Sequence, residues 1–366
     1  MSRQYGALSG VAIVLVVVNH SVHFGLQVSP VEGAWLKLLS LLQALGSFAV
    51  PAFLFVSGAF LSYAARELSF GFVRASLGRI LWPYVIWSTL FYGLVSLTNE
   101  VRPSIAVYIK NLLVGYPYHF VPILIFWYVT APIVVRVGKR HGALLLVAIG
   151  LYQTFLLALR WSDMVGAPGP LPDWMHALQP AVLSTSMSEW AIYFPLGLVL
   201  SQHAAALTPW LLGVRWLAVG ATVGLFVLGI LNAFEVMWAP WARFAAPVPL
   251  MFLLPVVERG WIPFVRGFEV VGRRSYGIYL AHLVVINLVV LLASWPRLNL
   301  DSRPLVVFPT FLVAALGASL LLMNVMTRTL PARSVYRLVF GIMPPVARIR
   351  GRRSGSGDVP MVAGNG

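Results

Sequence analysis

The sequence contains no cysteine and few charged residues. Only 10% of its 366 residues are Asp, Glu, Lys or Arg, against roughly a quarter in ordinary soluble domains. The absence of thiols excludes disulfides, cysteine nucleophiles and cysteine-ligated metal sites. The shortage of charge, together with 59% hydrophobic residues and a mean hydropathy of +0.85, excludes a soluble globular domain and indicates an integral membrane protein.

Acidic residues are especially scarce. The chain has 11 Asp and Glu against 26 Lys and Arg, a formal net charge of +15. In a soluble protein this excess would suggest a nucleic-acid partner, but here the basic residues lie in short loops between apolar runs, so no nucleic acid is expected. Most of them fall in alternate loops, which predicts a multi-pass protein of the cell (inner) membrane with both termini cytoplasmic. The first run lacks a convincing cleavage site and is interpreted as a retained helix.

Ten runs are long enough to cross the bilayer, since about 30 Å of hydrocarbon takes about 20 apolar residues. They are expected at 7–27, 42–63, 79–97, 119–136, 142–160, 182–201, 210–231, 241–258, 275–295 and 304–327. The prediction is an all-α bundle of about ten transmembrane helices within residues 1–340. Residues 104–115 are too short and polar to span and are expected at the outer surface. Residues 341–366, basic and Gly/Ser-rich, are expected to form a disordered cytoplasmic tail that contacts the lipid bilayer.

The organisation of the runs also bears on function. No internal repeat and no pair of broken helices is evident in the sequence, whereas many transporters are built from inverted repeats with discontinuous helices. This argues against a transporter.

The first run carries two histidines on one helical face, His20 and His23. Polar groups within spans are costly, so each is a candidate for a functional site. A neutral imidazole at His20 is suited to take a proton from a substrate hydroxyl. Alternatively, His20 is a packing residue held by hydrogen bonds between helices, and the residues alone leave both interpretations open. No metal is expected, because nothing else completes a ligand set for the two histidines.

Other polar residues lie in or beside the runs. Glu189 is either the carboxylate partner of a histidine or the partner of an arginine. Arg79, at the start of the third run, is interpreted as reaching the cytoplasmic interface, with anion binding as the alternative. Ser57, His119 and His282 complete this set.

Five stretches match one family in the same order along the chain. They are residues 10–20 (GVAIVLVVVNH), 51–58 (PAFLFVSG), 79–84 (RILWPY), 118–132 (YHF through AP) and 272–282 (GRRSYGIYLAH). Together they resemble the acyltransferase 3 family, the multi-pass membrane O-acyltransferases of bacterial surface glycans. The resemblance implies transfer of an acyl group, commonly acetyl, from cytoplasmic acyl-CoA to a hydroxyl of a carbohydrate or glycolipid on the outer side. It implies no permanently bound cofactor, since acyl-CoA is a substrate.

The resemblance maps the essential histidine of the family onto His20. The family motif has an arginine eleven residues earlier, where this chain has Ser9. Either another cation holds the donor, with Arg79, Arg273 and Arg274 as candidates, or the protein is a divergent member that exports or flips a glycan or lipid-linked precursor.

The leading hypothesis assigns roles to the remaining candidates. His20 acts as a base or as an acyl relay, Asn19 and Ser57 hydrogen-bond the reacting centre, and Arg79 holds the phosphates of acyl-CoA. Further candidates for the site are His23, His119, Glu189, Tyr276 and His282.

Overall fold

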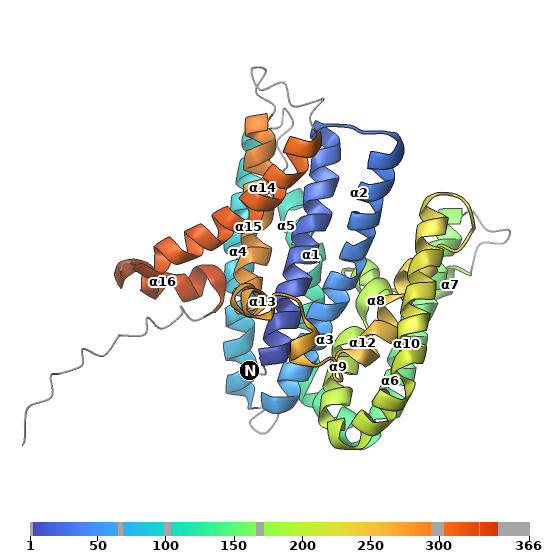
Figure 1. Cartoon of the computed structure of the whole chain (residues 1–366). Helices are drawn as coiled ribbons and strands as arrows, with labels where there is room; N and C mark the ends of the chain where they lie inside the picture. Colours follow the sequence, from blue (N-terminus) through green and yellow to red (C-terminus); the bar gives the residue numbers. More distant parts are fainter. Residues whose placement is uncertain are drawn as a thin grey trace, which may run out of the picture.

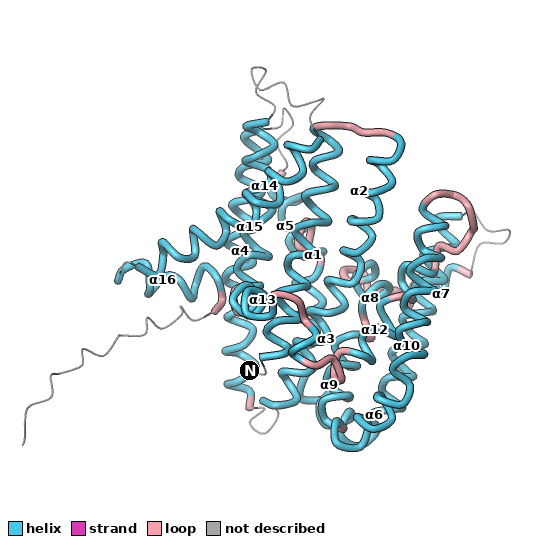
Figure 2. Tube along the Cα trace, in the orientation of Figure 1, coloured by secondary structure: helices cyan, strands magenta, loops and turns pink. Residues whose placement is uncertain are grey.

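The computed structural model describes residues 3–64, 69–98, 104–165, 172–293, 304–328 and 330–342. Within these residues the regular structure is entirely helical (Figures 1 and 2). Of the expected C-terminal tail, only residues 341 and 342 belong to the described part. The rest of that prediction therefore lies outside the described residues.

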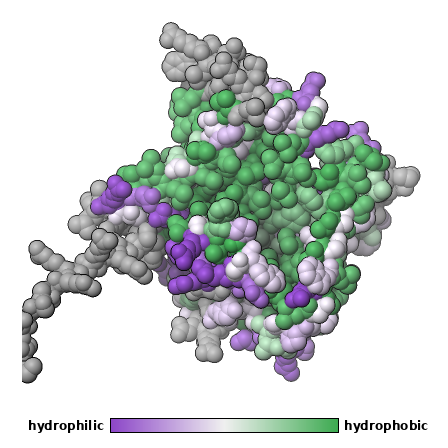
Figure 3. Space-filling model, viewed as in Figure 1, coloured by the Kyte–Doolittle hydropathy of each residue, from purple (hydrophilic) through white to green (hydrophobic). Residues whose placement is uncertain are grey.

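Seven of the described helical stretches are long and apolar enough to cross a membrane. They are α1 (Arg3–Val28), α2 with η1 and α3 (Gly33–Leu45, Gly46–Phe48 and Ala49–Ala64), α4 (Phe70–Thr98), α6 (Phe120–Val165), α10 (Ala204–Ala233), α14 (Ser275–Ala293) and α15 (Pro304–Arg328). An apolar band crosses the middle of the molecule, with hydrophilic residues gathered above and below it (Figure 3). The prediction of an all-α membrane protein is confirmed.

Helix α10 faces away from the bundle. Only 6% of its most apolar stretch is buried, and Trp216 and Leu217 are 72% and 74% exposed. An apolar side chain exposed on this scale is stable in lipid, where its contact with hydrocarbon costs nothing. We assign α10 to the lipid-facing edge of the protein.

Helix α6 contains two of the predicted spans. Its 46 residues are interrupted by a non-helical backbone at His141, and both arms pack against α9 (Tyr193–Gln202). The ring of Trp127 in the first arm stacks on Phe194 at 5.8 Å, while Gln153 in the second arm accepts a hydrogen bond from the Ile192 N–H at 2.8 Å. Because these residues lie at similar distances before and after His141, the two arms run antiparallel, as two separate spans would.

Two other predicted spans have interrupted hydrogen-bond ladders. The run 182–201 forms α8 (Ser184–Trp190) and α9, and the run 241–258 begins with α11 (Ala242–Ala245) and α12 (Pro247–Leu253). The backbone joining them keeps helical dihedral angles, at Ala191 and Ile192 in the first run and at Ala246 in the second. The helices are therefore interrupted in their hydrogen bonding, which the sequence did not indicate, but not in the course of their backbone. Hydropathy averages over a window and does not register a break of one or two residues. At the first break, buried Gln153 satisfies the freed backbone, accepting from Ile192 N–H and donating to the Glu189 carbonyl at 3.1 Å.

Helices meet closely at glycine pairs. Gly58 on α3 and Gly197 on α9 face each other, since a Cβ on either would lie about 2 Å from a backbone oxygen of the other helix. Gly10 on α1 and Gly272 on α13 (Val265–Gly272) do the same. Small residues permit this backbone approach between membrane helices. The Gly58 that follows Ser57 in the family-like stretch thus has a packing role.

The third span begins earlier than predicted. Helix α4 starts at Phe70, so Arg79 lies nine residues inside it and does not open it. Residues 70–78 include Arg74 and Ser76, which lowered the hydropathy of the window although the backbone is helical. The short segment after α4 forms α5 (Ile105–Val114), capped by the Ser104 side chain and by left-handed Gly115. This agrees with the prediction that the segment does not span.

Candidate functional site

Helix α1 places two key positions in two different cavities. Its 26 residues form one uninterrupted helix, so eleven residues separate Ser9 from His20 by about 16 Å along its axis. Ser9 lines one cavity and His20 lines another. We call these the Arg79 cavity and the His20 cavity.

The Arg79 cavity has a volume of about 610 Å³ and a cationic lining. Three arginines contribute to it: Arg79 from α4, Arg273 from the turn before α14, and Arg337 from α16 (Leu330–Phe340). None of the described residues that line it is acidic. With no carboxylate to neutralise three guanidinium groups, the cavity is suited to an anionic ligand.

The neighbours of Arg79 orient it towards this cavity. Its Nη2 donates a hydrogen bond to Ser76 Oγ, one turn earlier on α4, at 2.9 Å. The Tyr276 hydroxyl, from α14, donates to the carbonyl of Ile80 at 2.8 Å. Tyr276 therefore joins α14 to α4 beside Arg79 and has its hydroxyl already engaged. Arg274, the third cation proposed from sequence, does not line the cavity.

The His20 cavity, also about 610 Å³, is more mixed in character. Asn19, His20, His119 and Glu189 line it together with aromatic residues that include Trp190 and Phe244. The structure thus brings together these four sequence candidates, which come from α1, from the residue before α6, and from α8. It separates them from Ser57, which lines the Arg79 cavity.

Asn19 serves to hold α1 against the next helix. Its Nδ2 donates to the carbonyl of Gln43 on α2 at 2.9 Å. A Cβ at Gly46 would lie 2.6 Å from the Asn19 side chain, so Gly46 leaves the space that this amide occupies. Asn19 fixes the wall of the cavity next to His20.

A second histidine lies against His20. The His282 ring, fully buried on α14, is 5.2 Å from the His20 ring between centroids. Its Nδ1 lies 2.6 Å from the Tyr279 carbonyl and donates to it. Its Nε2 is buried and has no hydrogen-bond partner among the described residues. No described residue hydrogen-bonds the His20 ring, which leaves its nitrogens available to a ligand in the cavity.

Glu189 pairs with an arginine. Its carboxylate lies 2.5 Å from Arg160 Nη1 at the end of α6, and no histidine hydrogen-bonds it among the described residues. Of the two interpretations left open by the sequence, the contacts favour the arginine. His119 is held by its backbone, whose carbonyl accepts from Ser186 Oγ at 3.1 Å.

His23 lines neither cavity. It is exposed, and its Nε2 lies 3.4 Å from Gln27 Nε2, one turn further along α1. Across the described ranges, no three His, Asp or Glu side chains gather as metal ligands would.

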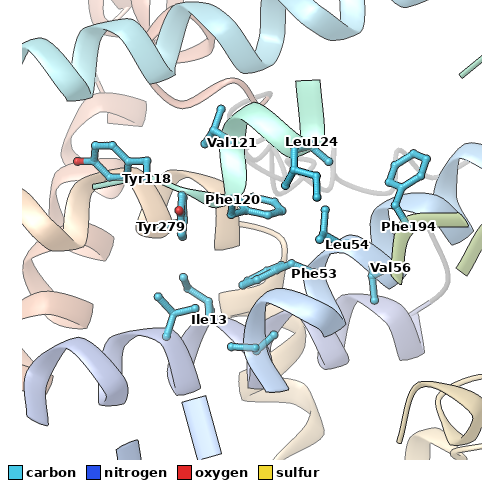
Figure 4. Close-up of a cluster of buried hydrophobic side chains, with 14 of the residues drawn as sticks. Ile13, Phe53, Leu54, Val56, Tyr118, Phe120, Val121, Leu124, Phe194 and Tyr279 are labelled. Atoms are coloured by element: carbon cyan, nitrogen blue, oxygen red, sulfur yellow. The ribbon is translucent and has the colours of Figure 1, made fainter. Parts of the chain in front are cut away.

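The two cavities share one wall. Phe120 and Tyr279 line both of them, with ring centroids 5.2 Å apart in an edge-to-face arrangement. Figure 4 shows the two rings side by side, with Phe53 below them. The Tyr279 ring in turn lies 5.7 Å from the His282 ring. A short series of rings therefore leads from the shared wall through His282 to His20.

Two cavity residues escaped the sequence-based reasoning. Arg337 lines the Arg79 cavity, and Arg243 lines the His20 cavity with its guanidinium 4.4 Å from the Phe244 ring centroid. Both were treated as topology signals. Their position in short helices outside the family-like stretches gave no local signal of a site.

The comparison with protein families decides the class of this protein. The acyltransferase 3 family model, described as an acyltransferase domain, matches residues 7–324. The chain belongs to the acyltransferase 3 family. It is a multi-pass membrane acyltransferase, and both cavities are lined mainly by residues within the matched part. No curated protein and no solved structure matches this chain.

Proposed function

We propose that this acyltransferase transfers an acyl group, in the first instance acetyl, from acyl-CoA to a hydroxyl of a carbohydrate or glycolipid. The donor binds in the Arg79 cavity, which opens to the cytoplasm, and the acceptor binds in the His20 cavity on the outer side. The observation that carries the proposal is the shared Phe120–Tyr279 wall between a cationic cavity and a histidine-lined one.

The donor side supplies charge complementarity. Arg79 and Arg273 form charge-assisted hydrogen bonds with the phosphates of CoA, contacts that suit guanidinium groups. The thioester, carried on the extended pantetheine arm, then reaches the shared wall. Ser57, on the same side, offers a hydroxyl towards the donor.

The acceptor side supplies the base. His20 takes the proton of the acceptor hydroxyl as its oxygen attacks the thioester carbonyl. The new C–O bond forms, the C–S bond breaks, and the CoA thiolate leaves and takes up a proton. His282, whose Nδ1 donates to the Tyr279 carbonyl, packs against the ring of His20 and holds it in position.

The decisive experiment compares cell-envelope glycans and lipids by mass spectrometry with the gene absent, restored, or restored as His20→Ala. A positioned general base contributes about 10²–10⁴-fold, so His20→Ala should abolish the acyl increment that the restored gene produces. The matched control is His23→Ala, three residues along the same helix, which lines neither cavity and should retain acylation.

Two outcomes would refute the proposal. One is parental acylation by membrane-inserted His20→Ala, which would remove the base from His20. The other is movement of an unmodified glycan or lipid-linked precursor across vesicles without any acyl donor, which would assign the cavities to export.

A further inference from the structure

We propose that helix α16 completes the donor site, with Arg337 binding a phosphate of the donor in the cavity that Ser9 of α1 also lines. The inference rests on the proposed function. It concerns α16, which follows residue 324 and so lies outside the part of the chain that the family model matches.

Helix α16 is firmly attached to the bundle. The Trp87 indole, on α4, donates a hydrogen bond to the carbonyl of Val339 at 2.9 Å. Phe340 is fully buried, and its ring lies 6.0 Å from that of Trp87 and 4.9 Å from that of Tyr336, which is also fully buried. Burial of two aromatic side chains removes a large apolar surface from water and stabilises the contact. The C-terminal half of α16 is therefore a fixed part of this region.

The end of α16 is pressed against the backbone of Arg79. Gly341 has a left-handed backbone (φ 68°), and a Cβ there would lie 2.1 Å from the Arg79 carbonyl oxygen. Its N–H donates to the Arg337 carbonyl at 2.9 Å, which places Arg337 one turn earlier on the same helix. Only glycine suits both requirements, positive φ and close approach. This contact sets Arg337 beside Arg79 at the same cavity.

The electrostatics of the cavity call for an anion with more than one charge. Arg337, Arg79 and Arg273 line it without any acidic residue among its described lining. Like charges held together repel each other, and phosphate groups offset that repulsion with charge-assisted hydrogen bonds. Ser9, buried on α1 at the same cavity, offers only a hydroxyl. Arg337 thus supplies a cation to a cavity where α1 itself contributes none.

Phosphate groups are carried both by acyl-CoA and by anionic lipids, and α16 is amphipathic enough to meet a lipid surface. The cavity favours CoA, because Arg337 shares it with Arg79 and with the Phe120–Tyr279 wall. Nanodiscs with and without an anionic lipid distinguish binding of a lipid phosphate from binding of CoA.

The test uses the purified full chain in phosphatidylcholine nanodiscs, with two donors. Acetyl-CoA carries phosphates, whereas acetyl-pantetheine does not. In Arg337→Gln, the KM for acetyl-CoA should rise about 10- to 100-fold, the range expected for a lost hydrogen bond to a charged group, while the KM for acetyl-pantetheine should stay unchanged. Arg337→Lys should recover part of the loss. Arg328→Gln, an exposed arginine on α15 that lines neither cavity, is the control.

Direct binding of CoA separates this inference from the proposed function. Loss of CoA affinity in Arg337→Gln, with Arg328→Gln unaffected, supports the role of Arg337 even without turnover. An equal change for both donors, or none for either, would overturn it while leaving acyl transfer intact. An effect seen only in nanodiscs that contain phosphatidylglycerol would assign Arg337 to lipid. Failure of the unmodified protein to bind CoA at all would overturn the proposed function as well.

Discussion

The Arg79 cavity and the His20 cavity have similar volumes but differently built walls. The Arg79 cavity is lined from α1, α3, α4, α6, α14 and α16 and from the turn at Arg273, and the charged side chains of its described lining are all arginines. The His20 cavity is bordered by both interrupted segments, through Glu189, Trp190 and Tyr193 on one and Arg243 and Pro247 on the other. An interrupted hydrogen-bond ladder inside a membrane is tolerated where protein or a polar cavity satisfies the freed groups. The described charged lining is thus purely cationic on one side of the Phe120–Tyr279 wall, whereas the other side combines histidines with one acidic and one basic side chain.

In the proposed function, this division suits a charged donor on one side and a hydroxyl acceptor on the other. A charged donor needs fixed cations, which α4, α16 and the turn before α14 supply. A hydroxyl acceptor needs a base and shape complementarity, which short helices and aromatic rings supply. The Phe120–Tyr279 wall lies between the two cavities, so removing it should change the activity of the enzyme more than any other substitution considered.

Opening the Phe120–Tyr279 wall should allow acyl-CoA to be hydrolysed without transfer to the acceptor. In Phe120→Ala the two cavities join, and we expect transfer to the acceptor to fall about 100-fold, since misplacing reacting groups by about 1 Å can cost that much. Hydrolysis of acyl-CoA without acceptor should rise at the same time, because water reaches the thioester. Both rates are measured with purified protein. Phe226→Ala, which enlarges only the His20 cavity, should not raise hydrolysis; a rise there would mean that the wall is not the barrier.

Removing a cation should affect the donor alone. Arg79→Gln should raise the KM for acyl-CoA about 10- to 100-fold, as expected for a lost hydrogen bond to a charged group, and leave the KM for the acceptor unchanged. Steady-state kinetics with each substrate varied in turn will show this. Arg74→Gln, five residues earlier on α4 and outside the cavity, is the control. An unchanged dependence on acyl-CoA concentration in Arg79→Gln would contradict the donor assignment.

Forcing α1 and α13 apart at their crossing, next to the Arg79 cavity, should lower the stability of the protein. A Cβ at Gly272 would lie 1.7 Å from the Gly6 carbonyl oxygen, so Gly272→Ala should lower the free energy of unfolding by about 1–3 kcal/mol, as overpacking does. Thermal-shift midpoints in detergent measure the change. Gly267→Ala, on the same helix, meets nothing within 4 Å and should match the parent. Equal midpoints for both variants would show that the helices separate freely.

The smallest effect is expected at the partly buried ion pair beside this crossing. The Arg259 guanidinium, 2.5 Å from Glu269, lowers the pKa of that carboxyl below its ordinary value. The ion pair stabilises the folded protein fully above the unfolded pKa of a glutamate, about 4.3. This stabilisation is lost as the pH falls through the lowered pKa of Glu269 in the folded protein. Glu269→Gln should therefore melt slightly below the parent at pH 7, with the gap closing in acid. Glu258→Gln serves as the control, and a gap that widens in acid would contradict this sign.

The sequence by itself determined the membrane class, most of the spans and the family. Hydropathy is a local sum, and hydrophobic burial in lipid scales with that sum, so α1, α10, α14 and α15 lie close to their expected positions. The family-like stretches likewise identified His20, Asn19 and Arg79 as residues to examine, because an isolated polar group in an apolar run is conspicuous without any knowledge of its neighbours.

Only the tertiary structure decided how these residues are grouped. Whether Ser57 joins His20 or Arg79, and whether Glu189 meets a histidine or an arginine, depends on contacts between helices far apart in sequence. In the sequence, Arg337 is not distinguishable from the other basic residues near the chain end. Its place at the Arg79 cavity follows from the contacts of α16 with Trp87 and with the backbone of Arg79. At close crossings such as Gly10 with Phe268 backbone meets backbone, and no local pattern of apolar residues encodes which pair of helices will approach that closely.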